Sequence, residues 1–216
     1  ATLGFLFVSY QTAQFGGLRN VLAVGIGVFA GIALYHASFG FTAAWRRIVT
    51  ERRGVGLRAQ MLLLGLTVLF TIPMIGWGDA GGFVQPIGVA LVFGSFLFGV
   101  GMQLGGGCGS GTLFTVGGGS TRMAITLVFF IIGSMFGIAH ASWWRGLPSL
   151  GRFSLTNDLG PVFAVLITFV LLALIWIGST IVERRAHGEL EKGRTTESLI
   201  SGPWSPWMGA VALGLV

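Results

Sequence analysis

The chain has 216 residues, of which 53% are hydrophobic and only 9% are charged. Soluble domains carry roughly 25% charged residues, so this composition excludes an ordinary soluble protein and predicts an integral membrane protein. Thirteen Lys and Arg against seven Asp and Glu give a formal net charge of +6. In a membrane protein such an excess usually orients the loops, and no basic helix or aromatic RNA-binding motif indicates a nucleic acid as partner.

Apolar stretches of about 20 residues, the length that spans a bilayer as a helix, follow one another along the chain. A short apolar piece at 2–13 comes before them, and a second short piece closes the chain at 208–216. Both ends of the sequence fall inside these apolar pieces, so we expect a fragment that lacks further membrane segments. The predicted spans are 19–36, 57–77, 83–104, 122–143 and 160–182.

Two segments between these spans differ in character from the rest. Segment 37–53 places aromatic residues next to a cluster of arginines, which predicts an amphipathic or re-entrant helix at the membrane interface. Segment 183–206 is polar and contains glycine and proline, which predicts a solvated linker. We therefore divide the chain into an N-terminal transmembrane half, 1–182, a cytoplasmic linker, 183–206, and the start of a second half, 207–216.

The predicted fold class is an all-α integral membrane protein with about five to six transmembrane helices and short broken or re-entrant helices. Small residues precede a break both near Ser38 and near Cys108, and each break is followed by a polar or basic stretch. Broken helices in repeated units indicate the binding region of a transporter. An inverted-repeat architecture is therefore expected.

Basic residues predict the orientation of the chain. With five spans, three of the thirteen Lys and Arg fall on one side of the membrane and ten on the other. By the positive-inside rule the side with ten is cytoplasmic, which predicts a multi-pass protein of the cell inner membrane. The ten are Arg46, Arg47, Arg52, Arg53, Arg58, Arg122, Arg184, Arg185, Lys192 and Arg194.

The only cysteine lies in a glycine-rich stretch directly after the span 83–104. Glycines do not continue a helix cheaply, and non-helical backbone at membrane depth persists only where it is buried in protein or lines a cavity. Consecutive amides and hydroxyls in such a loop could hold a small oxyanion, and a thiol suits an anion that ends in sulfur. The predicted substrate-binding residues are Gln103, Gly106, Gly107, Cys108, Gly109, Ser110, Gly111 and Thr112.

Other interpretations of these residues remain open. Small residues four apart also mark close helix packing in membranes, and Gln103 could equally hydrogen-bond to a neighbouring helix. His36 and His140 fit interface positions at the ends of their spans. A nucleotide P-loop is excluded because no Lys follows Gly111. One cysteine allows no intramolecular disulfide, and no clustered metal-ligand spacing is present, so we expect no metal and no cofactor.

The stretch around Cys108 is also similar to a segment found in a known family of membrane proteins. Residues 99–113, GVGMQLGGGCGSGTL, and residues 39–46, FGFTAAWR, resemble characteristic segments of the YeeE/YedE membrane family. The family segment that corresponds to residues 39–46 often includes a cysteine in related repeats, and this copy has none. The resemblance implies two inverted halves whose short helices narrow the passage, and transport of thiosulfate or a similar sulfur compound. It assigns to Cys108 the role of a relay thiol, with the adjacent glycines, Ser110 and Thr112 beside it.

Three functions therefore remain in view. The first is a transporter of thiosulfate or a related small sulfur-containing anion, without catalytic residues and with a soluble sulfurtransferase as a possible partner. The second is a membrane-embedded sulfurtransferase that forms a persulfide on Cys108, which requires activation of the thiol by a cation, a histidine or a helix amino end. The third is a structural membrane subunit, in which the Cys108 loop would be fully packed.

Overall fold

The computed structural model describes residues 2–38, 40–78, 81–196, 198 and 203–216, and of residues 2–9 and 11–16 only the backbone. The described residues form ten helices and no strand. Phe39 of the family-like segment, and residues 197 and 199–202 of the predicted linker, lie outside the described residues. The helices are α1 (Thr2–Ala37), α2 (Phe41–Thr50), α3 (Val55–Gly76), α4 (Val89–Gly105), α5 (Gly109–Gly117), α6 (Thr121–Ala139), α7 (Ala141–Arg145), α8 (Leu155–Asp158), α9 (Pro161–His187) and α10 (Pro206–Gly214).

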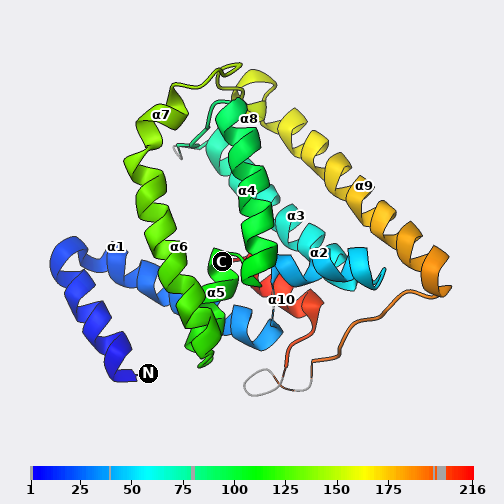
Figure 1. Ribbon diagram of the computed structural model, residues 1–216, viewed down its shortest axis with the longest axis horizontal. Coiled ribbons are helices and arrows are strands. Elements are labelled where there is room, and N and C mark those ends of the chain that lie inside the picture. The colour runs from blue at the N-terminus through cyan, green and yellow to red at the C-terminus, as the bar shows by residue number, and fades with distance from the viewer. Residues whose placement is uncertain (1, 39, 79–80, 197, 199–202) are drawn as a thin grey trace.

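Five helical stretches are long and apolar enough to cross a membrane, which confirms an all-α, multi-pass membrane protein. The first of them begins at Gly17, where α1 changes direction with a φ of 62°. Glycine reaches such a φ without a Cβ clash, and Figure 1 shows the N-terminal arm of α1 folded back at this point. The five stretches are Gly17–Thr50, Val55–Gly76, Val89–Gly117, Thr121–Ala139 and Pro161–His187.

Helix α4 begins at Val89 rather than at residue 83, where the sequence pattern placed the start of that span. The backbone before it pairs with a distant segment: the Ile87 amide donates to the Gly151 carbonyl at 2.9 Å, and the Leu150 amide donates to the Ile87 carbonyl at 2.8 Å. These hydrogen bonds hold the backbone at Ile87 and Gly88 beside residues 148–151, and Gly88 is extended. Hydrophobicity alone did not predict this pairing because its partner is about 60 residues away in the chain.

Gly88 lies in this pairing and has no room for a side chain. A Cβ there would come within 2.6 Å of the Pro148 carbonyl oxygen and 2.8 Å of the Ser149 Cα. Because backbone cannot yield as a flexible side chain can, Gly88→Ala is expected to lower the stability of the fold by about 1–3 kcal/mol. Thermal unfolding of the purified protein in detergent measures this. Gly94→Ala, where a Cβ meets nothing within 4 Å, is the matched control and should leave the transition unchanged.

Small residues bring three helices together in the core. Ala33 and Ala37 of α1, Ala59 of α3 and Ala210 of α10 are buried in one cluster with Trp204. Such residues let helix backbones approach closely, which is the main source of helix association in a membrane. Helix α10 thus packs against both α1 and α3, and α3 also packs along α9.

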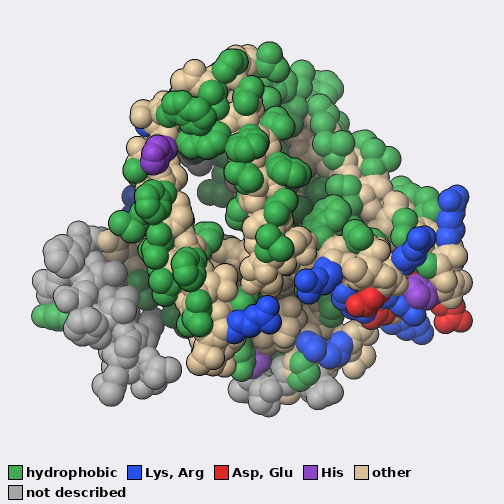
Figure 2. All heavy atoms as spheres, viewed as in Figure 1, with side chains coloured by type: hydrophobic (Ala, Val, Ile, Leu, Met, Phe, Trp, Pro, Cys, Tyr) green, Lys and Arg blue, Asp and Glu red, His purple; other side chains and the backbone are tan. Residues whose placement is uncertain are grey.

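A buried ion-pair network closes one end of the bundle. Glu183 of α9 is completely buried, and its Oε2 accepts hydrogen bonds from Arg58 Nη1 at 2.6 Å and from the Gly54 amide at 3.1 Å. Its Oε1 accepts from the Glu191 amide at 2.8 Å, and Arg53 lies 3.5 Å away. Helix α9 extends five residues beyond the predicted end of this span. The hydrogen bonds between Glu183 and the turn between α2 and α3 stabilise this extension. Figure 2 shows Lys and Arg side chains gathered around this end.

Two units of the fold repeat one another. Each has a long helix, a break, a short helix and a second long helix: α1, α2 and α3 in one, and α4, α5 and α6 in the other. In each break a residue with positive φ, Ser38 (49°) or Gly106 (78°), stands two positions before the residue that caps the short helix. Helix α1 contacts α5, and α2 contacts α4. The short helix of each unit therefore lies against the first long helix of the other.

Candidate functional site

The candidate site is the break between α4 and α5. Helix α4 ends at Gly105, and Gly106 follows with a left-handed φ of 78° that favours glycine. Cys108 is then extended and caps the amino end of α5. Figure 1 shows α5 between the lower ends of α4 and α6. The glycines predicted to break the span do so where the sequence pattern placed the break.

Cys108 is half-buried, and its sulfur takes part in the capping of α5. Cys108 Sγ accepts a hydrogen bond from the Gly111 amide at 3.4 Å and lies 3.3 Å from Ser110 Oγ. Among the described hydrogen bonds none uses the amides of Gly109 and Ser110. The amino end of a helix carries a partial positive charge. A thiol, a hydroxyl and two free amides therefore share one end of α5, an arrangement suited to an anion.

Of the predicted site glycines, Gly107 leaves little room for a side chain beside α6, whereas Gly109 would accept a Cβ at ordinary contact distance. A Cβ on Gly107 would lie 3.0 Å from Met123 Cε and 3.2 Å from Thr112 Oγ1, and one on Gly109 would lie 3.5 Å from Phe130 Cζ. Thr112 is itself buried, with 2% of its surface exposed. These residues determine the shape of the loop. The hydrogen-bond donors on its open side are the Ser110 hydroxyl and the free amides of Gly109 and Ser110.

The remaining predicted residue, Gln103, lies in the last turn of α4 and is half-buried, on the helix rather than in the break. Two histidines of the chain lie outside this region. His140 Nδ1 is 2.9 Å from the carbonyl of Phe136 in the preceding turn, and His187 Nε2 is 2.9 Å from the carbonyl of Glu51 at the charged end. Both imidazoles therefore contact a backbone carbonyl of the protein rather than the break at Cys108.

A cavity of about 790 Å³ runs between α1 and α5 and includes Ser110 in its lining. A second cavity of about 400 Å³ continues from it, and both are lined by Tyr35, His36, Phe114 and Gly118. The sequence pattern placed His36 at the membrane interface and missed its proximity to α5. That proximity depends on a contact between α1 and α5, which are more than 70 residues apart.

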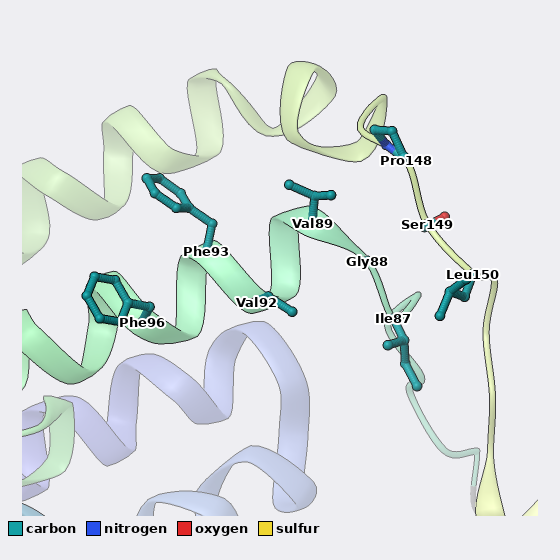
Figure 3. Close-up of a pocket in the computed structure, with 9 residues that line it drawn as sticks. All are labelled: Ile87, Gly88, Val89, Val92, Phe93, Phe96, Pro148, Ser149 and Leu150. Atoms are coloured by element: carbon teal, nitrogen blue, oxygen red, sulfur yellow. The ribbon is translucent and has the colours of Figure 1, made fainter.

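A further cavity of about 740 Å³ lies at the other end of α4, as Figure 3 shows. Its side chains are almost all apolar, with Phe93 and Phe96 on one wall and Leu150 on the other. Phe93 also stacks on Trp144 with ring centroids 5.8 Å apart. Apart from the Ser149 hydroxyl, the side chains of this surface offer no hydrogen-bond donor to an anion, so the polar loop at Cys108 remains the candidate site.

Comparison with known proteins places the chain among transport proteins. Residues 36–216 match the model of a family described as sulphur transport. Over 130 residues the chain is 28% identical to the thiosulfate transporter TsuA of Spirochaeta thermophila, covering 59% of this chain and 39% of TsuA. Over 159 residues it is 28% identical to the probable transporter YedE of Salmonella typhimurium, covering 70% of this chain and 38% of YedE. The matched parts are less than half the length of either relative.

Proposed function

The chain belongs to this sulphur transport family, and from that membership we propose that it carries thiosulfate or a related small sulfur-containing anion through the membrane. Cys108 and the amino end of α5 would form the constriction at which the anion is recognised. We further propose the inner membrane as location and the cytoplasm as the side of the basic end, following the positive-inside rule. Residues 1–182 would then form one half of the transporter, 183–206 a cytoplasmic linker, and 207–216 the start of the second half.

The observation that carries the proposal is the set of groups at the start of α5. The amides of Gly109 and Ser110 lack acceptors among the described hydrogen bonds, and the Ser110 hydroxyl lies beside the Cys108 thiol. A dianion that leaves water loses its hydration at a cost of many kcal/mol unless other donors replace it. Neutral donors at a narrow point can replace water and still release the ion, which conduction requires.

The thiol adds selectivity for sulfur in this proposal. Cys108 Sγ is polarizable and a weak hydrogen-bond donor, so it suits the terminal sulfur of thiosulfate better than a small hard oxygen. No Lys or Arg lies between Gly101 and Thr121. Recognition there would therefore rest on neutral donors, without the desolvation cost of a buried cation. A soluble sulfurtransferase that accepts sulfur at the basic end fits as the partner that consumes the anion.

Uptake of ³⁵S-labelled thiosulfate tests the proposal. Cells without thiosulfate importers of their own should accumulate the label when they produce the protein, and unlabelled thiosulfate should compete far better than sulfate because only thiosulfate carries terminal sulfur. Cells with the empty vector set the background. Accumulation no higher than this background would contradict the proposal. A stable persulfide on Cys108 during turnover, detected by mass spectrometry, would favour the enzyme alternative instead.

A further inference from the structure

The two connected cavities between α1 and α5, lined in common by Tyr35, His36, Phe114 and Gly118, form what we call the α1–α5 groove. We infer that this groove is a second binding site for the same sulfur-containing anion, with the His36 imidazole as its central hydrogen-bond donor. The inference rests on the proposed function and adds to it a residue and a location. It places a resting point further along α5 from Cys108.

The His36 ring is held in place by its aromatic neighbours, but its nitrogens make no hydrogen bond to a described residue. It stacks on Trp204 with centroids 5.6 Å apart and planes at 22°, and it meets Tyr35 edge-on with centroids also 5.6 Å apart. The His36 carbonyl accepts a hydrogen bond from the Trp204 amide at 2.8 Å. No hydrogen bond from a described residue reaches the ring nitrogens. An imidazole always has at least one N–H to donate, so a fixed ring that lines a cavity beside serine hydroxyls offers this donor to a ligand.

Hydroxyl groups supply the other donors of the groove. Ser38 and Ser120 line the smaller cavity, where Ser120 Oγ accepts from the Met123 amide at 3.4 Å and keeps its own hydrogen to donate. Ser120 also caps the amino end of α6, a helix of 19 residues whose second residue is Arg122. The positive end of this helix therefore lies at the groove, where it favours an anion.

No acidic side chain is present in the described lining of the groove to repel an anion from these donors. The residues lining the two cavities in the described part of the chain include no Asp and no Glu. Thr115 Oγ1 donates to the Gly111 carbonyl at 2.6 Å and is thereby occupied within α5. The groove thus resembles the start of α5 chemically: it offers neutral donors and a helix end, and no Lys or Arg is among its described lining residues.

The groove is also continuous with the thiol site. Ser110 lines its larger cavity, and Ser110 Oγ lies 3.3 Å from Cys108 Sγ. Helix α5 has nine residues, so the way along it to Gly118 is about 13 Å at 1.5 Å per residue. At Gly118 a Cβ would come within 2.9 Å of the Tyr35 ring, which shows how closely α1 approaches α5. An anion that leaves Cys108 along α5 therefore passes Ser110 and then reaches His36.

Binding and transport by His36 variants test this inference. The apparent Kd of the purified protein for ³⁵S-thiosulfate and the KM for uptake into liposomes should both rise about 10-fold in His36→Ala, as expected for the loss of one hydrogen bond to a charged ligand. His36→Asn, which keeps an N–H donor, should recover part of the affinity. His140→Ala is the matched control, because His140 lies at the opposite end and its Nδ1 contacts only its own helix; it should behave as the wild type.

The outcomes distinguish a failure of the second binding site from a failure of the proposed transport function. Normal Kd and KM in His36→Ala, together with a loss of uptake in Cys108→Ala, would overturn the groove and leave the transporter intact. No thiosulfate binding by the wild type would overturn both. If size-exclusion chromatography shows that His36→Ala is misfolded, Ser120→Ala, which removes a hydroxyl donor of the groove, and His36→Asn decide in its place, and Ser120→Ala should weaken thiosulfate binding. Affinities for both variants equal to that of the wild type would then refute the inference.

Discussion

Replacing Cys108 with serine is expected to reduce thiosulfate uptake by about 10-fold or more, because a sulfur contact to a charged ligand is lost. Serine is the informative replacement because it is a preferred N-cap. Cys108 Sγ caps α5 through the Gly111 amide, and a serine hydroxyl can accept the same hydrogen bond. Cys108→Ser therefore keeps the fold of the loop and removes only the sulfur. Initial rates of ³⁵S-thiosulfate uptake into proteoliposomes measure the effect.

Cys108→Ala removes the sulfur and the cap together, so it should lose at least as much uptake as Cys108→Ser and about 1 kcal/mol of stability in addition. Ser134→Ala is a suitable control, since Ser134 Oγ bonds only to the Phe130 carbonyl of its own helix. Uptake by Cys108→Ser at the wild-type rate would show that sulfur plays no part in recognition. The constriction would then work through its amides and hydroxyls alone.

The largest loss of stability is expected for Glu183→Ala. The carboxylate of Glu183 is completely buried and bonds to Arg58, which is itself 4% exposed. Its removal leaves the guanidinium of Arg58 buried without its counter-charge, and the amides of Gly54 and Glu191 lose their acceptor. Breaking such a buried pair costs about 3–5 kcal/mol. Thermal unfolding of the purified protein in detergent should show a clearly lowered transition.

Glu189→Gln is the control for this variant, because Glu189 is exposed and six residues further along the chain. It should unfold as the wild type does, since exposed charges contribute little. The double variant Glu183→Leu with Arg58→Met should be more stable than Glu183→Ala, because no unpaired charge then remains buried. If Glu183→Ala unfolds at the wild-type temperature, Glu183 does not hold this end of the bundle together.

The long helices and the break at Cys108 could be predicted because both are local properties of the sequence. A run of apolar residues suffices for a span, and Gly106 with Cys108 suffices to end one helix and cap the next. Predicted spans and observed helices differ where a distant segment decides the outcome. Helix α4 starts late because residues 87–89 pair with 148–151. The early end of α6 at Ala139 is instead a local break, after which α7 begins at Ala141.

Burial of charge was the other feature that the sequence did not reveal. Arg58 falls at the start of the predicted span 57–77 and Glu183 at the start of the predicted solvated linker, and in the fold each supplies the opposite charge that the other needs when buried. His36 is similar: its sequence neighbours fit a membrane interface, and its position at α5 follows from packing between α1, α5 and Trp204. Single-sequence patterns do not carry such long-range contacts.

The stacking of His36 on Trp204 has a consequence for biogenesis. Trp204 directly precedes α10, which packs between α1 and α3, so the imidazole gains its support only after residues some 170 positions downstream have entered the membrane. An insertion intermediate that ends before Trp204 would contain the thiol loop and all five long helices, yet its histidine would be unsupported. Ribosome-bound chains of increasing length should therefore acquire the ability to retain thiosulfate late, once α10 has emerged and docked.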